Sequence, residues 1–592
     1  MRKLVLLLIA FVIFPLVTTL AQPVEDYILE HRGDTLVVAD DFEAGAPNSL
    51  YLLLQSDTSN ASYTVPAGRV YMLHKSGYYS LVNGPTTPSD REVVIVGEDS
   101  SPIKTNQAWD YPPVICGAAY DGENYGGGMT SSMSLVVKNC NIELGSANRG
   151  TISWNWFGYS ANARVTVDNC IMEHTYWVMF NLGTNSKTYI KNSYFVNMSG
   201  QACRRNGGVI DYFNPIDTIF VENCTHLVAQ GSIYKFRSNF TNVAIYNHNT
   251  FLDLAGYVFM NVGYQKYMSV TNNIFMNCNV QAWSGNTSFD PGEIDVNALP
   301  MGLINVAPED SIGCAATDLH FYVDNNLVYW DETLTNATDG VVATINANNM
   351  SNINTWQSQM ITMNSRTQSM FDDDAKYPYL TEGTWIKDVM PNFTNPEDLL
   401  TTQLEAIKAY AIDKADTGST LILADWRLVN PGLDNFTYAD WPIPVDLSYD
   451  NAELLTAGLG GFPVGDLNWF PTQNAEWLAQ REQEYTDITA ALNGTVGIAD
   501  GSELPNDFKL LQNYPNPFNP TTVISYIIPE ASNVTLKVYD VLGREVATLV
   551  NQFQNANSYQ VNFDASSLSS GVYMYTIEAG NFKMTKKMLL LQ

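Results

Sequence analysis

The chain has 592 residues, of which 45% are hydrophobic and 15% charged, and its 61 acidic and 30 basic residues give a formal net charge of −31 at pH 7. The apolar content excludes a disordered protein. The scarcity of Lys and Arg argues against nucleic acid as a partner, because neutralising phosphates takes a broad basic surface. The length exceeds that of one ordinary domain, so we expect several domains or a repeat array.

The N-terminus is organised like a secretory signal peptide. Arg2 and Lys3 form a basic start, an apolar run covers residues 4–16, and small residues precede a cleavage site that we expect after Ala21. No later stretch approaches the ~20 apolar residues of a transmembrane helix. We therefore predict that residues 1–21 are removed and that the mature protein is exported without a transmembrane segment.

A motif of an aliphatic residue, any residue and asparagine recurs through the first half of the chain. Successive motifs are 30, 23, 31, 24, 25 and 53 residues apart, and we interpret the last step as two turns with an insertion. Such periods indicate a repeat architecture. The motif asparagines are Asn139, Asn169, Asn192, Asn223, Asn247, Asn272 and Asn325.

Each repeat alternates apolar and polar residues before its asparagine, as in Val165, Thr166, Val167 and Asp168. Period two predicts a strand with one buried face. The same phase makes Val243 and Ile245 inward-facing in their repeat. Because no amphipathic helix separates these strands, we predict an all-β fold, a right-handed parallel β-helix, in which the asparagines stack at one corner of successive coils.

The positions on either side of the asparagine carry further predictions. The outward position before it runs Lys138, Asp168, Lys191 and Glu222, so adjacent coils should place opposite charges side by side. The position after it is cysteine in several repeats. Stacking brings Cys140 and Cys170 within disulfide reach, but a ladder of small buried side chains is the favoured alternative. The odd total of seven cysteines argues against a disulfide scaffold.

The β-helix is predicted to extend over residues 22–492, with its first coils from Val65 and Arg91. Residues 396–413 and 474–492 have the apolar spacing of helices and should cover the end of the coil, whose last strand would otherwise offer an open edge. The sequence leaves the structure of residues 340–470 undetermined. A polar linker is expected at 493–506.

Residues 507–592 contain short strands between regularly spaced turn signals, which predicts a small immunoglobulin-like β-sandwich. The run NYPNPFNP (513–520), Leu542-Gly543-Arg544-Glu545 and Gly571-Val572-Tyr573 closely resemble the type A sorting domain of the type IX secretion system. This resemblance implies the type IX secretion machinery as a partner, passage across the outer membrane, removal of the domain, and a location at the cell surface or outside the cell.

The predicted β-helix resembles the pectate-lyase-like superfamily, which implies a groove for extracellular polysaccharide. The fold serves lyases, hydrolases, esterases, adhesins and spacers, so it does not decide the function. Calcium-dependent members need stacked Asp and Glu, and the outward positions here alternate in sign. The sequence therefore predicts no metal and no cofactor; calcium is possible but not supported, and metal dependence stays open. A paired-carboxylate hydrolase has weak support, because Asp372-Asp373-Asp374 lies outside the repeats.

Basic residues, scarce elsewhere, gather at one place in two coils. The 31-residue shift that relates Asn192 to Asn223 places Arg204 over Lys235, with Arg237 two residues further on. We predict β-elimination from an acidic sugar: Arg204 and Arg237 would neutralise the carboxylate, and Lys235 would remove the adjacent proton as the base.

Three further residues, Arg205, His226 and His248, are predicted to bind the substrate on neighbouring coil segments. The alternative for the whole cluster is a solvated face on which the basic residues pair with Asp211, Asp217 or Glu222. Ion pairing of Arg204, Lys235 and Arg237 would contradict the lyase hypothesis. As a separate indication, aromatic residues gather in one region of the early coils, where they could form a stacking platform for sugar rings or pack inside the coil: Trp154, Trp156, Tyr159, Tyr176 and Trp177.

The sequence thus predicts an exported β-helix protein that binds or processes acidic polysaccharide, with lyase chemistry as the specific hypothesis. The alternative is a non-enzymatic surface adhesin or extracellular structural protein.

Overall fold

A computed structural model of the chain divides into two compact units, Met1–Val496 and Gly497–Gln592. The residues that it describes are 24–45, 48–59, 65–66, 68–81, 84–98, 112–117, 128–143, 155–173, 175, 177–198, 208–229, 231–237, 239–280, 299–348, 357–394, 404–409, 445–492, 509–510, 513, 516, 518–528, 532–554, 557–566, 568–580 and 582–591. The predicted signal peptide and linker lie outside these residues.

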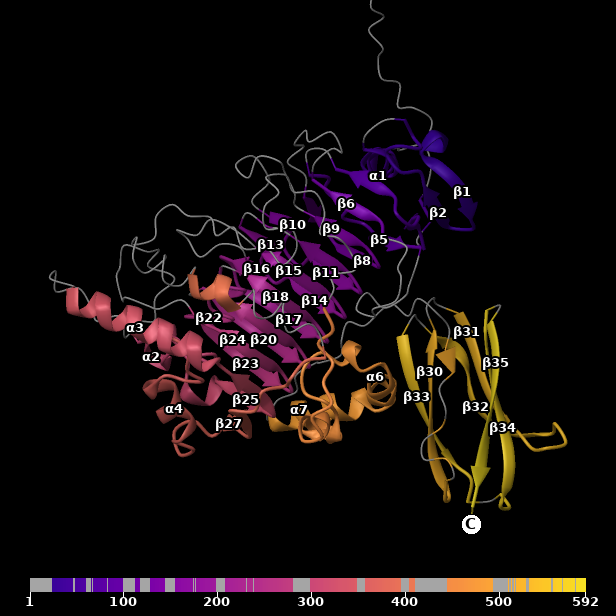
Figure 1. The fold of residues 1–592 in the computed structure, drawn as a ribbon. Helices are drawn as coiled ribbons and strands as arrows, with labels where there is room; N and C mark the ends of the chain where they lie inside the picture. Colours follow the sequence, from indigo (N-terminus) through magenta and orange to yellow (C-terminus); the bar gives the residue numbers. More distant parts are fainter. Residues whose placement is uncertain are drawn as a thin grey trace, which may run out of the picture. The chain divides into compact units, whose positions relative to one another are not determined.

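The first unit is a parallel β-helix, as predicted (Figure 1). From β7 to β24, successive strands pass from sheet C to sheet A to sheet B and back to sheet C, so each of these coils adds one strand to each sheet. Sheet A contains, in spatial order, β1 (Ile28–Arg32), β2 (Thr35–Val38), β3 (Val70–Leu73), β5 (Glu92–Gly97), β8 (Ser134–Lys138), β11 (Arg164–Asp168), β14 (Lys187–Lys191), β17 (Ile216–Glu222), β20 (Phe240–Asn247), β23 (Tyr264–Thr271), β25 (His320–Asp324) and β27 (Leu380–Glu382).

The other two sheets are shorter. Sheet B contains β4 (Tyr78–Ser80), β6 (Val114–Cys116), β9 (Asn141–Glu143), β12 (Ile171–Glu173), β15 (Tyr194–Met198), β18 (Thr225–Ala229), β21 (Thr250–Leu254), β24 (Ile274–Cys278), β26 (Asn326–Tyr329) and β28 (Trp385–Lys387). Sheet C contains β7 (Met129–Ser131), β10 (Asn155–Tyr159), β13 (Val178–Leu182), β16 (Gly208–Tyr212), β19 (Tyr234–Phe236) and β22 (Phe259–Asn261).

Stacked apolar side chains fill the interior of the coil. Val167 pairs with Val137 on one side and with Ile190 on the other, and all three are fully buried. The predicted alternation of charge outside the coil is also present, because Lys138 Nζ lies 3.8 Å from Asp168 Oδ2. The coil begins earlier than predicted: β2 already pairs in parallel with β3.

The motif asparagines occupy a corner that requires left-handed backbone. Asn169, Asn223 and Asn272 have φ of 52°, 51° and 59° after their sheet A strands, a conformation that asparagine tolerates better than most residues. The prediction for Asn247 was wrong by one residue. Asn247 pairs with Glu222, so the corner residue of that coil is His248, with φ of 53°.

The same one-residue shift changes the inward phase of β20. Ala244 and Tyr246, rather than Val243 and Ile245, pair with the inward Ile219 and Val221. The 53-residue step was also misinterpreted. Strand β25 pairs directly with β23, so this step is one coil with a long insertion, not two turns.

The position after the corner forms a ladder of small side chains. Cys140 Sγ contacts the carbonyl oxygen of Lys138 at 3.0 Å, and Ser193 Oγ donates to that of Lys191 at 2.6 Å. The described cysteines are free thiols, so Cys140 and Cys170 form no disulfide. In later coils Asn249, Asn273 and Asn326 continue the ladder through amide hydrogen bonds.

Helical segments cover parts of the coil. The helices are α1 (Ser49–Ser59), α2 (Glu309–Ile312), α3 (Glu332–Asn348), α4 (Ser365–Phe371), α6 (Pro471–Leu478) and α7 (Arg481–Ala491). The predicted helix at 474–492 is thus two helices, and of the one at 396–413 the structure describes residues 404–409, which are helical. Within the described residues, no helix has both the length and the hydrophobicity that a membrane span requires.

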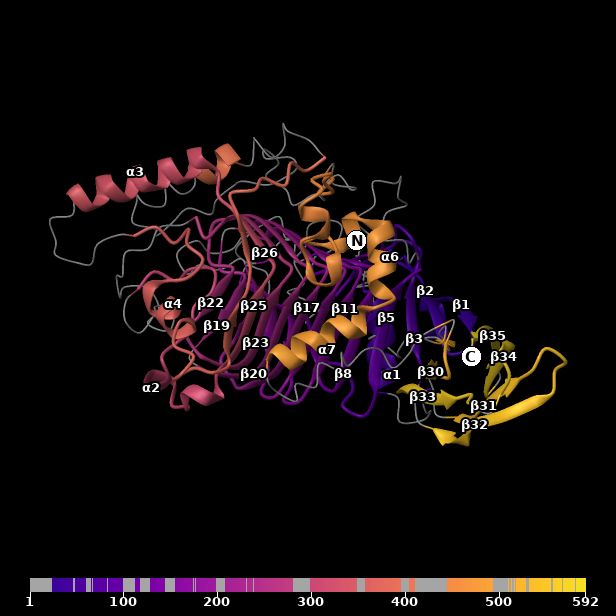
Figure 2. The ribbon, with the colours of Figure 1, turned by 90° about the horizontal axis from the view of Figure 1, so that it is seen from below.

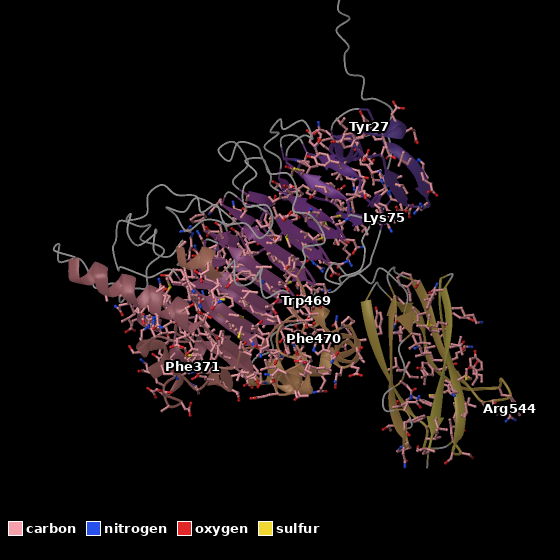
Figure 3. All side chains as sticks on the ribbon, viewed as in Figure 1. Tyr27, Lys75, Phe371, Trp469, Phe470 and Arg544 are labelled. Carbon is pink, nitrogen blue, oxygen red and sulfur yellow. The ribbon has the colours of Figure 1, made fainter. Side chains whose placement is uncertain are left out.

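Helix α7 lies across the strands of sheet A (Figure 2). Arg481 Nε and Tyr485 Oη donate to Glu222 Oε2 on β17, at 2.7 and 2.5 Å. Trp469 and Phe470, labelled in Figure 3, belong instead to the apolar cluster on the outer face of sheet B, which includes Tyr194. The C-terminal part of the unit therefore covers the outer faces of two sheets, rather than only the end of the coil.

The second unit is a β-sandwich of two antiparallel sheets around its own core. One sheet contains β29 (Lys509–Leu510), β30 (Thr521–Ile528) and β33 (Asn557–Asp564), and the other β32 (Glu545–Gln554), β31 (Ser532–Tyr539), β34 (Gly571–Ala579) and β35 (Phe582–Leu590).

Candidate functional site

The basic residues singled out by the sequence surround one buried carboxylate on sheet C. Arg237 Nε and Nη2 donate to the two oxygens of Asp211 at 2.7 and 2.8 Å. Lys235 Nζ lies 3.9 Å from Asp211 Oδ2. Trp177 Nε1 also donates to Asp211 Oδ2, at 2.9 Å. We refer to Trp177, Asp211, Phe213, Lys235 and Arg237 as the Asp211 cluster.

The strand register explains why these groups meet. Asp211 on β16 pairs with Lys235 on β19, and both point away from the coil interior, because the adjacent Ile210 and Tyr234 belong to the core. The offset between the two partners is 24 residues. The predicted alignment of Arg204 over Lys235 used an offset of 31, so it does not match the register of sheet C.

An exposed aromatic ring borders the Asp211 cluster. Phe213 follows β16 and is 54% exposed. The guanidinium carbon of Arg237 lies 4.6 Å from the centre of the Phe213 ring, and the Trp177 ring lies 5.9 Å from it. An apolar ring with a cation over its face suits both cation–π contact and stacking against a sugar.

The geometry does not prepare Lys235 as a base. Its side chain is fully buried and faces a carboxylate, which stabilises the protonated ammonium rather than the neutral amine that proton abstraction needs. Of the three predicted catalytic residues, Lys235 and Arg237 are ion-paired with Asp211. Arg204 lies outside the described residues, as does Arg205, the first of the predicted substrate-binding residues.

The two predicted histidines are placed away from the Asp211 cluster surface. His226 points into the coil, where its ring stacks between Phe195 and Phe251 with centroid distances of 4.7 and 4.5 Å. His226 Nε2 lies 2.8 Å from the Tyr234 hydroxyl. His248 is fully buried at its corner, with Nε2 3.3 Å from Glu484 Oε1. Neither imidazole faces a surface on which a glycan chain could lie.

The sequence interpretation missed a carboxylate pair on sheet B. Glu143 and Glu173 are strand neighbours on β9 and β12, and both are buried. Burial raises the pKa of the Glu143 carboxyl well above its usual range, and the charge of Glu173 raises it further. The sequence could have revealed this pair, because the 30-residue step that relates Asn139 to Asn169 also relates these two glutamates. Their burial keeps them from an extended polysaccharide.

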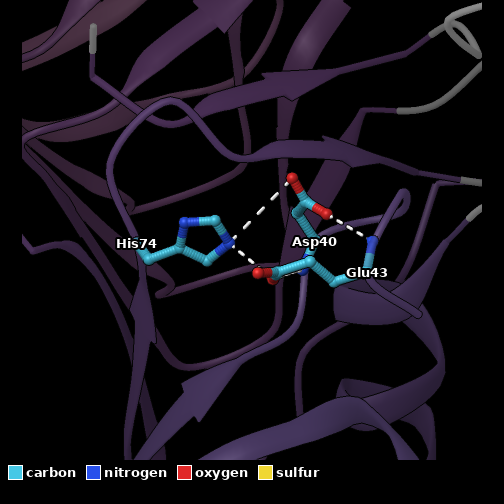
Figure 4. A group of neighbouring side chains, drawn as sticks. All are labelled: Asp40, Glu43 and His74. Atoms are coloured by element: carbon cyan, nitrogen blue, oxygen red, sulfur yellow. Dashed lines mark hydrogen bonds and ion pairs between the residues drawn. The ribbon is translucent and has the colours of Figure 1, made fainter. Parts of the chain in front are cut away.

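A second missed group lies near the start of the coil. The ligand atoms of Asp40, Glu43 and His74 lie within 4.8 Å of one another (Figure 4). Histidine, cysteine, aspartate and glutamate are the usual metal ligands, and among the described residues these three have ligand atoms close enough together to hold a metal ion. No motif spacing marks it, because Asp40 and His74 come from different coils.

Comparison with known proteins concerns the second unit. Residues 512–591 match the family described as secretion system C-terminal sorting domain. This segment is a type IX sorting domain. The protein is therefore exported across the outer membrane to the cell surface or the extracellular space. No curated protein matches the chain.

The fold of the sorting domain explains several of its motif residues. Asn513 N donates to the Tyr575 hydroxyl at 2.9 Å, and Asn513 Nδ2 donates to Thr522 Oγ1 at 3.0 Å, so this buried asparagine fixes the entry of the chain into the sandwich. Gly543 has φ of 78° in the turn between β31 and β32, a conformation that favours glycine. Asp540 closes that turn through the backbone N–H of Arg544.

Proposed function

We propose that this exported β-helix protein binds an acidic extracellular polysaccharide, and that the Asp211 cluster on sheet C contributes to the binding surface. The observation that carries the proposal is the exposed Phe213 ring, with the Arg237 guanidinium over it and Trp177 beside it. A single exposed ring is common on protein surfaces, so the proposal depends on the cation and the second aromatic ring that lie against Phe213.

Charge supports an acidic ligand. Within the Asp211 cluster, Lys235 and Arg237 are the basic side chains, and Asp211 is the acidic group that they share. The chain as a whole carries −31. A polyanion is repelled by most of such a surface, and a local cation next to an aromatic platform gives it a defined place to bind. The resemblance of the coil to the pectate-lyase-like superfamily agrees with this substrate class.

The same geometry favours binding over elimination. A lyase base must lose its proton and reach the sugar, whereas Lys235 is buried beside Asp211. Lyase activity is therefore not part of the proposal. It stays testable in the same experiment, because the unsaturated product of β-elimination absorbs ultraviolet light.

The test uses the chain without residues 1–21, titrated with polygalacturonate, alginate and neutral dextran. We expect binding to the uronate polymers, weakened by added salt, and about tenfold weaker binding for Phe213→Ala, which corresponds to ~1.4 kcal/mol. The matched control is Phe553→Ala, which removes another exposed phenylalanine, from the sorting domain. Absence of binding to every polymer would favour the non-enzymatic adhesin or structural protein instead, and equal affinity of both variants would exclude the Asp211 cluster from the binding surface.

A further inference from the structure

The chain positions Asp40, Glu43 and His74 together at the start of the β-helix. Asp40 follows β2 by two residues, Glu43 lies in the turn after it, and His74 directly follows β3. Strands β2 and β3 pair in parallel, with Val38 opposite Leu73. The segments that leave the two strands therefore emerge side by side, and this brings residues 34 positions apart into contact (Figure 4).

The three ligand atoms are directed at one point. His74 Nε2 lies 2.8 Å from Glu43 Oε2 and 3.9 Å from Asp40 Oδ2. The side chain of Asp40 is only 9% exposed. Its Oδ1 accepts a hydrogen bond from Glu43 N at 2.7 Å, whereas the structure gives Oδ2 no hydrogen bond from the described residues. A buried carboxylate oxygen thus faces the imidazole and has no hydrogen-bond donor among the residues that the structure describes.

The orientation of the imidazole is set from the other side of the ring. His74 Nδ1 lies 3.0 Å from the carbonyl oxygen of Lys75. A carbonyl oxygen can only accept, so Nδ1 carries the hydrogen and Nε2 is the nitrogen that faces the carboxylates. This arrangement, with Nδ1–H bound to a backbone carbonyl and Nε2 turned inward, is typical of metal-ligating histidines.

The backbone around the histidine is also held in place. His74 N donates to the Tyr79 hydroxyl at 3.2 Å, and that hydroxyl donates to Val38 O at 3.0 Å. These bonds tie the ends of β2 and β3 to each other before any ion is bound. Such preorganisation reduces the ordering that metal binding requires.

Two carboxylates and one imidazole nitrogen face one another in this group, and their charges must be compensated. With a neutral imidazole the group carries two negative charges, and Nε2 and the carboxylates are all acceptors that repel one another. Either a second proton on the imidazole or a divalent cation resolves this. A cation satisfies Asp40 Oδ2 as well, which a proton on Nε2 at 3.9 Å does not.

We propose that Asp40, Glu43 and His74 bind a divalent transition-metal ion, and that Zn²⁺ fits the donor set best. One imidazole nitrogen and two carboxylate oxygens are ligands that Zn²⁺ takes in tetrahedral geometry, with a fourth position for water. Ca²⁺ prefers six to eight oxygen ligands, so the histidine disfavours it. The Glu43 side chain is 43% exposed, which gives an ion a path from solvent.

The site would join the first two strands of the coil that pair in parallel. Strands β2 and β3 lie near the N-terminal edge of sheet A, and a metal bridge between their ends would oppose fraying there. Binding to the folded state only would raise the stability of the protein in proportion to the logarithm of the metal concentration.

The experiment uses the full chain without residues 1–21, treated with EDTA and desalted. Titration with Zn²⁺ by isothermal calorimetry should give one site per chain, and Zn²⁺ should raise the melting temperature. His74→Ala should weaken the binding at least tenfold and abolish the shift in melting temperature. The matched control is His31→Ala, because His31 pairs with Glu25 at 3.0 Å on the surface, and no third ligand joins them among the described residues.

Two conservative variants guard against a folding defect in His74→Ala. Glu43→Gln and Asp40→Asn keep the size of each side chain but remove a charged ligand, and each should also weaken Zn²⁺ at least tenfold. A wild-type chain that binds no Zn²⁺ at one equivalent, or variants that retain wild-type affinity, would overturn the proposal and leave an imidazolium ion pair. Ca²⁺ in place of Zn²⁺ should give no melting shift; a larger shift with Ca²⁺ would contradict the assignment of the metal.

Discussion

Arg237 holds Asp211 with two parallel hydrogen bonds, from Nε at 2.7 Å and from Nη2 at 2.8 Å. Lys235, the strand neighbour of Asp211, approaches the same carboxylate. One buried anion therefore serves two buried cations from one coil. Removing one member of such a buried ion-paired group leaves a buried charge without its partner, and this lowers the free energy of unfolding strongly.

The first prediction concerns this shared carboxylate. Asp211→Asn should destabilise the β-helix by about 3 kcal/mol, because Lys235 and Arg237 would keep their charges in a buried place without their common counter-ion. Urea unfolding followed by circular dichroism measures the change. The control is Asp217→Asn, which breaks a half-exposed pair with Lys187 at 3.3 Å and should cost less than about 1 kcal/mol. Equal effects of the two variants would contradict the buried role of Asp211.

The second prediction concerns the asparagine ladder inside the later coils. Asn273 accepts from Asn249 N and Nδ2 at 2.9 and 3.0 Å, and it donates to Asn326 Oδ1 and to Tyr246 O. Asn273→Ala should destabilise the coil by about 3 kcal/mol or more, because several buried groups lose their partners at once. The shift of the urea midpoint measures this loss.

An exposed asparagine provides the comparison for Asn273. Asn336 lies on the solvent side of α3, and Asn336→Ala should be neutral or slightly stabilising, since alanine has the higher helix propensity. If Asn273→Ala unfolds at the same urea concentration as Asn336→Ala, the ladder does not stabilise the coil as argued.

The third prediction is a pH dependence that arises from Asp253. Burial raises the pKa of the Asp253 carboxyl from 3.8 to about 7, although the hydrogen bond from Asn277 lowers it. The folded protein therefore holds this proton more tightly than the unfolded chain does. The associated stability is fully present below pH 3.8 and is lost as the pH rises from there to about 7.

Asp253→Asn removes that penalty without changing the shape of the side chain. Asparagine also suits the left-handed backbone at this position, where φ is 56°. We expect the variant to be more stable than wild type at pH 8 by about 2–4 kcal/mol, with a smaller difference at pH 4. Asp374→Asn, at an exposed position, should follow the wild-type curve. Parallel curves for Asp253→Asn and wild type would exclude a buried titration at this position.

The coil was predictable from the sequence because its side chains repeat with the strand period. Val137, Val167 and Ile190 stack as their alternation indicated. The exceptions have a physical reason. The corner requires a residue with a left-handed backbone conformation, which need not be asparagine. Histidine is also among the residues that adopt this conformation. His248 fills the corner, so a search for asparagine selected Asn247 and shifted the strand by one residue.

The Asp211 cluster was predictable only in part. The ion pair between the basic residues and Asp211 was among the alternatives, but the spacing of sheet A was applied to sheet C. Loops of different lengths make the offset between neighbouring coils vary from sheet to sheet, so Lys235 pairs with Asp211 rather than Arg204. The Asp40, Glu43 and His74 group could not be found this way, because its members lie in the turns that follow the strands, where no period applies.

The last prediction concerns how α7 is held on sheet A, through Glu484. Burial alone would raise the pKa of the Glu484 carboxyl. The nearby His248 and hydrogen bonds from Asn247 and Trp477 outweigh burial and lower this pKa below 4.5. A depressed folded pKa means that the associated stability is fully present above pH 4.5 and is lost as the pH falls through the folded value.

Acid should therefore loosen α7, and Glu484→Gln should imitate acid at neutral pH. We expect the variant to be less stable than wild type by about 1–3 kcal/mol at pH 7 and to lose less further stability between pH 4.5 and pH 3. Urea unfolding at each pH measures both effects. Glu476→Gln, which changes an exposed acid on α6, should reproduce the wild-type curve. If Glu484→Gln and wild type lose the same stability over this window, Glu484 is not the group through which acid acts on α7.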